Sequence, residues 1–492
     1  MSDLSATVLP TKNGFHVEGY EKIAYDFTFL DGIFNLENVQ LANCYRQWGR
    51  ALAVTDLNIY NLYGKQMKAY FEHYGLELQF HKTKIGEKAK TIPTLLSIVD
   101  SMTDFGIIRK EPVLVVGGGL VTDVAGFACA AYRRNTNFIR IPTTVIGLID
   151  ASVSIKVAVN YGNYKNRLGA YHAPIHTFLD FTFLRSLPIA QIRNGFAELV
   201  KISTCAHLDT FNLLEKYCEA LIDTGFGRKD GAPEEIREAA DKINKEGIHE
   251  MLKLETPNLH EIGLDRVIAY GHTWSPMHEL VPETPLRHGH AISIDMAYSA
   301  TLANSRHLIS DQDHRRILSL FSRAGLAMDH HQFDEHILDI GTAAIKRTRD
   351  GKLRAAVPNP IGSCTFLNDV SLEEMKSVLR RHKNIMSEYP RNGEGIEAFV
   401  DASDTGYTES NEAEIEATEY AAFKAGEVNG NGHITDGKGQ NGTNGINGSV
   451  NGNVGTMVHV ASSSHELNGE KLPNGVANGF TTPTNGLTNG YH

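Results

Sequence analysis

Between residues 50 and 144, short apolar runs alternate with stretches that have the periodicity of an amphipathic helix. The runs are RALAVTD, LELQFHK, PVLVVGGG and NFIRIPTT, and helical patterns between them include one that ends near residue 74 and one near 90–105. Strands that alternate with helices form a parallel sheet, because a parallel crossover needs a connection long enough to hold a helix. The pattern therefore predicts an α/β fold whose sheet is covered by helices on both faces.

Two changes of composition divide the rest of the chain. After about residue 187, long amphipathic patterns dominate, such as those over 191–222 and 371–389. Beyond about residue 400, Asn-Gly pairs repeat without the alternating apolar strands that would make them hairpin turns. We expect an α/β domain over 1–187, a mainly helical domain over 188–398 and an Asn/Gly-rich disordered tail over 399–492.

Composition excludes several kinds of partner. The formal net charge of −11 argues against a nucleic-acid partner, because proteins that hold nucleic acid normally present a basic face. No basic segment followed by an apolar run opens the sequence, and it contains no long apolar stretch, which argues against secretion and membrane insertion. Five scattered cysteines without CxxC spacing favour reduced thiols. We expect a cytoplasmic protein that acts on a small molecule.

A glycine turn joins the run VLVVGGG to a helical pattern. Gly117, Gly118 and Gly119 place backbone N–H groups at the start of a helix, where an anion such as a pyrophosphate is favoured. Asp123, one turn into that helix, could bond a ribose or a nicotinamide amide, or it could only favour the helix dipole. Asp56, at the end of an earlier strand, is a candidate to bond a ribose. The alternative is a tight strand-to-helix connection without a ligand.

Three fragments of the second half, GFAELVK, AYGHTW and RHGHA, contain candidate metal ligands. Glu198, His272 and His288 are a carboxylate and two imidazoles, which is the ligand set of a catalytic zinc site with an open position. Lys201 shares a helix face with Glu198, because the two are three residues apart. With 22 histidines in the chain, the alternative is that these are ordinary core or surface histidines.

A second polar cluster follows the run NFIRIPTT. It contains Asp150, Lys156, Lys165, Asn166 and His172, in the segments IDASVSIK and NYKNRLGAYH. Lysines bind phosphate as point charges, and an amide can bond phosphate oxygens or sugar hydroxyls. The alternative is a solvated loop.

Taken in order, eight motifs resemble the signature of the dehydroquinate synthase superfamily, the NAD- and zinc-dependent sugar phosphate cyclases. They are GGGLVTDVAGFACAAYRR, RIPTT, IDASVSIK, KNRLGAYH, FLRSLP, NGFAELVK, GHTW and HGHA, and the resemblance covers about residues 40–390. It implies an N-terminal Rossmann-like, NAD-binding α/β domain with a parallel sheet. It also implies a C-terminal, mainly α-helical domain that binds the metal and the substrate.

The resemblance also implies roles for particular residues. Those implied to hold NAD are Asp56, Glu87, Lys90, Gly117, Gly118, Gly119, Asp123, Thr143, Thr144, Lys165 and Phe183. Those implied to bind zinc, or another divalent ion such as cobalt, are Glu198, His272 and His288. Those implied to face the substrate are Arg134, Asp150, Lys156, Asn166 and Lys201. Because the arginine matching Arg134 reaches the neighbouring subunit's site in this family, a homodimer is implied, and Lys352 or Arg354 is implied to complete a phosphate pocket.

The chain departs from dehydroquinate synthases at four positions. Where those enzymes carry a lysine, an arginine, an asparagine and a histidine, it holds Met251, Asp265, Ala269 and Pro276. Losing two cations removes the bonds that a substrate carboxylate would need, and an aspartate would repel it. We therefore expect a heptulose phosphate without that carboxylate, with Asp265 bonding one of its hydroxyls. Pro276 is compatible with a helix that begins there.

These departures resemble the cyclases that use sedoheptulose 7-phosphate. That branch comprises the 2-epi-5-epi-valiolone synthases and the desmethyl-4-deoxygadusol synthases of mycosporine biosynthesis. The motifs AYRRNTNFIRIPTT, IDASVSIKVAVN and GAYHAP are more similar to the second group, because valiolone enzymes tend to have glycines at Ser152 and Ser154 and proline at Ala173.

The resemblance implies a lyase that removes phosphate and water from sedoheptulose 7-phosphate to give desmethyl-4-deoxygadusol. The implied steps are transient oxidation by NAD, β-elimination of phosphate, re-reduction and an intramolecular aldol closure. We expect Lys201 to transfer protons, and Lys156, Asn166 and Arg134 to hold the phosphate. The alternatives are a 2-epi-5-epi-valiolone synthase, an NAD- and metal-dependent polyol dehydrogenase of the glycerol dehydrogenase type, and a non-catalytic scaffold.

Overall fold

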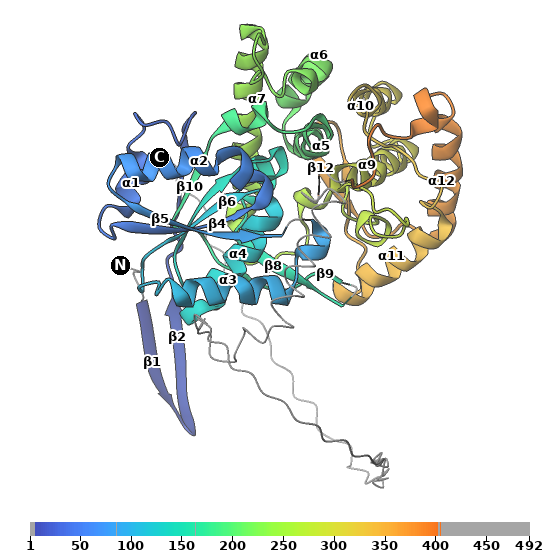
Figure 1. Cartoon of the computed structure of the whole chain (residues 1–492). Coiled ribbons are helices and arrows are strands. Elements are labelled where there is room, and N and C mark those ends of the chain that lie inside the picture. Colours follow the sequence, from blue (N-terminus) through green and yellow to red (C-terminus); the bar gives the residue numbers. More distant parts are fainter. Residues whose placement is uncertain (1–4, 85, 163, 402–403, 405–492) are drawn as a thin grey trace, which may run out of the picture. The chain divides into compact units, whose positions relative to one another are not determined.

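The apolar runs of the first half become strands of one six-stranded parallel sheet (Figure 1). The computed structural model describes residues 5–84, 86–162, 164–401 and 404. The sheet order is β3-β10-β7-β6-β4-β5, and every neighbouring pair is parallel. The strands are β3 (Asp26–Phe29), β4 (Arg50–Asp56), β5 (Glu77–Thr83), β6 (Val113–Gly117), β7 (Phe138–Pro142) and β10 (His176–Leu179). The predicted α/β class with a parallel sheet is confirmed.

Helices cover both faces of this sheet. On one face, α1 (Gln40–Tyr45) and α2 (Leu57–His73) pack against alternate residues of the central strands, such as Ala51 and Ala53. On the other face, α3 (Ile92–Asp104) and α4 (Gly119–Ala131) pack against Leu52 and Val54. Because both sides of each central strand are buried, these strands are continuous apolar runs in the sequence and do not alternate.

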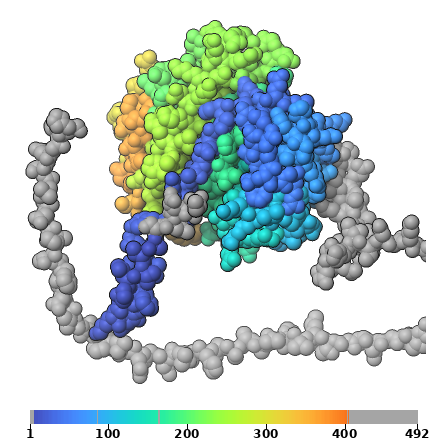
Figure 2. Space-filling model, turned by 90° about the vertical axis from the view of Figure 1, so that its left-hand side faces the viewer, coloured from blue at the N-terminus to red at the C-terminus, as the bar shows by residue number. Residues whose placement is uncertain are grey.

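Two antiparallel hairpins in this half were not predicted from the sequence. The first pairs β1 (Ser5–Thr11) with β2 (Gly14–Tyr20), and its side chains are exposed, as the dark blue atoms of Figure 2 show. The second pairs β8 (Lys156–Tyr161) with β9 (Tyr164–Tyr171), and β8 packs on α4. The solvated-loop alternative for the second polar cluster is therefore wrong over these strands.

The second half is mainly helical, as predicted. Its helices are α5 (Ile189–Ala206), α6 (Leu208–Asp223), α7 (Glu234–Glu255), α8 (Ser275–His278), α9 (His288–Ser305), α10 (Asp311–Arg323), α11 (Glu335–Thr348) and α12 (Leu372–Met386). A short antiparallel pair, β11 (Ala355–Pro358) with β12 (Cys364–Leu367), lies among them. The core helices are α5 and α9, and every residue of α9 from Gly289 to Asn304 is buried. The amphipathic pattern over 191–222 is two helices, which part at His207 because its backbone is extended (φ −149°, ψ 93°).

Short 3-10 and π-helical turns complete the described chain. They are η1 (Glu87–Ala89), η2 (Tyr132–Arg134), η3 (Gly147–Ala151), η4 (Phe181–Arg185), η5 (Thr256–Asn258), η6 (Val267–Ala269) and η7 (Pro390–Gly393). The expected boundary at 187/188 falls between η4 and α5, but contacts group the described residues into one compact unit. The two expected domains inside that unit therefore stay a prediction.

The predicted tail lies almost wholly outside the described residues, so its disorder stays a prediction too. The structure continues past 398, however, because Phe399 forms a β-bridge with Leu286 and Arg287 Nε donates to Asp404 Oδ1 over 3.1 Å. Among the described residues, no helix is long and apolar enough to cross a membrane.

Candidate active site

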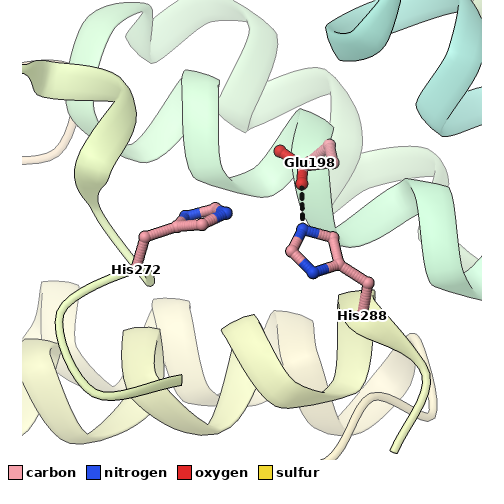
Figure 3. Close-up of side chains that lie close together, drawn as sticks. All are labelled: Glu198, His272 and His288. Carbon is pink, nitrogen blue, oxygen red and sulfur yellow. Dashed lines mark hydrogen bonds and ion pairs between the residues drawn. The ribbon is translucent and has the colours of Figure 1, made fainter. Parts of the chain in front are cut away.

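The helical half brings together the three predicted metal ligands (Figure 3). Glu198 lies in the middle of α5, His272 precedes α8, and His288 is the first residue of α9. One ligand atom from each of the three side chains lies within 4.8 Å of the other two. His288 Nε2 is 3.1 Å from Glu198 Oε1, and the two imidazole centroids are 5.2 Å apart.

Two glycines explain why these distant segments converge. A Cβ on Gly289 would lie 2.0 Å from the carbonyl oxygen of Asn194, so only glycine lets the start of α9 lie directly against α5. Gly271 has a φ of +78°, and a Cβ there would lie 2.6 Å from Met296 Cγ. The turn that carries His272 is therefore packed tightly against α9.

A buried carboxylate on α9 holds the same turn through hydrogen bonds. Asp295, on α9, accepts the backbone N–H groups of Trp274 and Ser275 over 2.5 and 2.9 Å. These N–H groups lie at the start of α8, where a helix has no partners of its own for them. Asp295 therefore caps α8 and holds the chain just after His272.

The triad is strongly charged even without a metal. Burial alone would raise the pKa of Glu198, but the Lys201 ammonium and the His288 imidazole hold it well below its usual range. Burial would lower the pKa of His288, but the carboxylates of Glu279 and Glu198 raise it to about 9. Burial, the Lys201 charge and the neighbouring His288 lower the pKa of His272 to about 3. The site therefore combines one carboxylate and two imidazole groups, of which the carboxylate is buried and the two histidines are partly exposed.

The residues present fit a divalent metal ion. His272 directs Nδ1 to the Tyr270 carbonyl oxygen at 3.3 Å, which leaves its Nε2 as the atom available to a ligand. His288 likewise directs Nε2 toward Glu198. Two imidazole nitrogens and a buried carboxylate are the donors of a three-ligand zinc site.

A second group with possible metal ligands is His207, Glu246 and Glu250. In it, Lys253 Nζ lies 2.8 and 3.0 Å from the two oxygens of Glu250. The lysine already neutralises that carboxylate, so we assign no metal there.

Lys201 and Asp150 lie beside the triad. Lys201 Nζ is 2.5 Å from Glu198 Oε2 and 3.8 Å from Asp150 Oδ1, and the lysine is buried. Burial would lower the pKa of Lys201, but the two carboxylates raise it. The ammonium therefore lies within reach of both carboxylates, beside the triad.

The glycine turn lies at the carboxyl end of β6, between the ends of β4 and β7. Gly118 is the N-cap of α4, and a Cβ there would lie 3.1 Å from Thr144 Cγ2. Its φ is −74°, so the glycine is needed for space and not for an unusual backbone conformation. Thr143 follows β7, and its Oγ1 is buried without a hydrogen-bond partner in the described part of the chain. Free backbone N–H groups, an orphan hydroxyl and the missing Cβ fit the phosphates of a dinucleotide.

Asp56 ends β4 on the same edge of the sheet. Its carboxylate accepts the Ile59 N–H over 2.8 Å and thereby caps α2. Burial raises the pKa of Asp56 to about 6, although that N–H opposes the shift. Phe183, another predicted cofactor residue, is buried, and its ring packs edge-on against Tyr63 and Phe34.

Lys90 joins two predicted groups of residues. Its Nζ lies 2.5 Å from Asp123 Oδ2 and 2.5 Å from Asn166 Oδ1. Asp123 was predicted to face the cofactor and Asn166 the substrate, so one buried ammonium links the two.

Of the other residues predicted to face the substrate, Lys156 forms ion pairs and Arg134 does not. Lys156 Nζ lies 3.2 Å from Glu255 Oε1 and 3.0 Å from Glu261 Oε1. Arg134 is exposed and pairs with none of the described residues. His172 Nε2 donates to the Thr136 carbonyl oxygen over 2.8 Å, and the ring packs on a phenylalanine, as a core histidine does.

The positions that differ from dehydroquinate synthases lie along one stretch of the helical half. Met251 and Ala269 are buried, and Pro276 stands in the first turn of α8, as expected. Asp265 is not free: it forms an ion pair with Arg354, which also bonds Asp350 over 2.7 Å. Arg354 is thus neutralised by two aspartates, and Lys352 is exposed.

Sequence reasoning missed Glu279, which follows α8 and is buried. Its Oε2 is 3.3 Å from His288 Nδ1, and its Oε1 is 2.7 Å from Lys165 Nζ. The available signal was an acidic residue in the short apolar segment PMHELV, next to the metal motif.

Comparison with known proteins gives consistent matches. Residues 81–194 match the family model described as 3-dehydroquinate synthase N-terminal, and residues 195–345 match the one described as 3-dehydroquinate synthase C-terminal. The chain is 55% identical over 399 residues to a demethyl-4-deoxygadusol synthase from Trichormus variabilis, which covers 81% of this chain and 97% of the relative.

Valiolone synthases match less closely. One from Actinoplanes sp. is 36% identical over 377 residues, covering 76% of this chain and 94% of the relative. A solved 2-epi-5-epi-valiolone synthase from Streptomyces hygroscopicus subsp. jinggangensis, with NAD+ and Zn2+ bound, has a TM-score of 0.70 at 34% identity. It covers 75% of this chain and 99% of that one. The resemblance predicted from the eight motifs is confirmed.

Proposed function

This chain belongs to the 3-dehydroquinate synthase family and is a sugar phosphate cyclase of that kind, and we propose that it converts sedoheptulose 7-phosphate into desmethyl-4-deoxygadusol. The observation that carries the proposal is the 55% identity to a demethyl-4-deoxygadusol synthase, against 36% to a valiolone synthase. Demethyl- and desmethyl-4-deoxygadusol are the same compound.

The geometry supports a substrate without a carboxylate. Dehydroquinate synthases have a lysine and an arginine where this chain has Met251, which is buried, and Asp265. Arg354 lies next to that place, but it is already paired with Asp265 and Asp350. A second anionic group on the substrate would meet Asp265 and Asp350 there, and these aspartates would repel it.

We further propose NAD at the glycine turn and a divalent ion, zinc or one such as cobalt, at Glu198, His272 and His288. The Streptomyces relative solved with NAD+ and Zn2+ supports both. When bound, NAD would take up and return a hydride, and the metal would acidify neighbouring substrate hydroxyls. Among the residues named for NAD, Asp56 would bond a ribose, and Thr143 and Thr144 would lie beside the phosphates.

The chain's own residues would then orient the substrate. Lys201 would donate a proton from Nζ to a substrate oxygen and take it back, with Asp150 holding its charge. Oxidation next to the reacting C–H would allow phosphate to leave by β-elimination, and Lys156 and Asn166 would hold that phosphate. Re-reduction, ring opening, intramolecular aldol closure and loss of one water would complete the reaction. NAD would be regenerated in each turnover, so the enzyme would be a carbon-oxygen lyase.

A homodimer is part of the proposal. The exposed Arg134 would reach the phosphate in the neighbouring subunit, which gives a role to an arginine that has no partner among the described residues. The five free cysteines support a reducing compartment, and we propose the cytoplasm.

The test is incubation of the purified protein with sedoheptulose 7-phosphate, NAD and Zn2+. Phosphate release with an ultraviolet-absorbing, dehydrated product would support the proposal. A non-absorbing product one water heavier would identify a 2-epi-5-epi-valiolone synthase. Net NADH without phosphate release would identify a polyol dehydrogenase instead.

A further inference from the structure

Glu279 contacts both halves of the candidate active site through the two oxygens of one carboxylate. Its backbone N–H donates to the Ser275 carbonyl over 2.9 Å, which fixes the residue at the end of α8. The side chain is buried, with 8% of its surface exposed. A buried carboxylate is costly unless charged or polar partners surround it, so its partners define what it does.

One partner is the metal ligand His288. Its imidazole directs Nε2 to Glu198 at 3.1 Å and Nδ1 to Glu279 Oε2 at 3.3 Å. When a metal is bound, the Glu279 carboxylate would hold the imidazole proton on Nδ1, and the Nε2 lone pair would be left for the ion. Such outer partners orient the imidazole and make it a stronger donor to a metal.

The other partner is Lys165, on β9 of the sheet half. Lys165 Nζ is 2.7 Å from Glu279 Oε1 and 3.6 Å from Glu87 Oε1. Glu87 in turn accepts from Asn160 Nδ2 over 2.7 Å. The Lys165 ammonium therefore lies between the carboxylate of Glu87, in η1, and the carboxylate of Glu279, which contacts His288.

We infer that Glu279 is a positioning residue that orients His288 for the metal and makes metal affinity depend on Lys165, which touches no metal ligand. The inference rests on the proposed metal at the triad, but not on the proposed substrate. Loss of Lys165 would leave the Glu279 carboxylate buried without its cation, and the carboxylate would then be free to rotate. That rotation would weaken its hold on His288.

The experiment uses the full-length protein, freed of metal by a chelator and titrated with Zn2+ and with Co2+. Glu279→Gln should lower the affinity for each ion about 10- to 100-fold and shift the visible absorption bands of bound Co2+. Lys165→Ala should lower the affinity several-fold and shift the same bands. In the double variant the two losses should not add, because Lys165 acts through Glu279.

Glu111→Gln is the matched control. Glu111 is another buried carboxylate bound to a cation, Arg50 Nε at 3.0 Å, and it precedes β6 at the end remote from the glycine turn. It should lower thermal stability without changing metal affinity or the Co2+ spectrum. If Glu279→Gln fails to fold, Lys165→Ala still tests the link.

The outcomes separate the inference from the proposed function. Wild-type metal affinity and an unchanged Co2+ spectrum in both variants would overturn the inference, even if the enzyme makes the proposed product. Fully additive losses would also overturn it, since Lys165 would then act independently. Weakened binding in both variants of a protein inactive on sedoheptulose 7-phosphate would support the inference and reject the substrate. Wild-type protein that binds neither ion would reject both.

Discussion

The proposed cofactor side of the site lies at the ends of adjacent strands, whereas the proposed metal side is made from segments far apart in the sequence. Asp56, Gly117 and Thr143 follow one another at the carboxyl edge of the sheet and present backbone groups and a hydroxyl. Glu198 and His288 come from two helices and are surrounded by buried charges. The comparison indicates that the sheet side depends on space and the metal side on charge balance.

The largest effect should come from removing a charge on the metal side. Glu198→Gln keeps the shape of the side chain but removes the only carboxylate of the triad, so zinc content should fall and turnover should drop about 1,000-fold or more. Metal analysis together with phosphate release measures both. An active Glu198→Gln enzyme with full zinc content would remove Glu198 from the metal site.

A smaller loss of turnover is expected from Lys201, whose charge lies next to the proposed metal site but does not bind the metal. Lys201→Ala should lose about 100- to 10,000-fold in turnover with its zinc content intact, because proton transfer is lost. The same two measurements apply. Retained turnover would exclude Lys201 from the mechanism, and lost zinc would make it a structural partner of Glu198.

On the sheet side, the room available at the glycine turn should determine how tightly NAD binds. Gly118→Val adds a side chain that points at Thr144, and it should lower NAD affinity about tenfold or more while metal affinity stays unchanged. Binding of NAD is measured by calorimetry. Gly14→Ala is the control, because a Cβ there has 3.9 Å to its nearest neighbour. Equal losses of NAD and metal binding in Gly118→Val would break the comparison.

The smallest effect on activity is expected for a substitution of Asp56. Its main effect should be on how the free energy of unfolding depends on pH. The folded carboxyl, with a pKa of about 6, binds its proton more tightly than an unfolded one, with a pKa of about 3.9. Its contribution to stability therefore falls as the pH rises from about 4 to about 6 and is constant above that.

Asp56→Asn keeps the helix cap and removes this titration. Relative to wild type, it should gain up to about 3 kcal/mol at pH 7 and nothing near pH 4, with NAD bound a few-fold more weakly. Urea unfolding of both proteins at the two pH values measures the difference, with Asp100→Asn on the exposed side of α3 as control. A gain that is equal at both pH values would contradict the prediction.

The same contrast explains what the sequence could predict. The central strands were predictable because a strand that is buried on both faces has a continuous apolar sequence. The hairpin of β8 and β9 was not, because its charged and glycine-containing segments resemble a loop. The three metal ligands came from recognised motifs, since spacing alone does not separate ligands from ordinary histidines. Glu279 was missed because its importance arises only when α8, α9 and β9 meet.

The positions at which we expect this chain to differ from dehydroquinate synthases lie on α7, on α8 and on the segment between them, outside the sheet that carries the glycine turn. Met251 and Ala269 are buried, Pro276 is exposed in the first turn of α8, and Asp265 takes its counter-charge from Arg354 in the helical half. Substitutions there can alter which sugar is accepted while the strand ends and the metal ligands keep their positions. Under the proposed function, the substrate pocket could therefore change while the cofactor and metal sites stay as they are, and the same architecture could act on a different sugar phosphate.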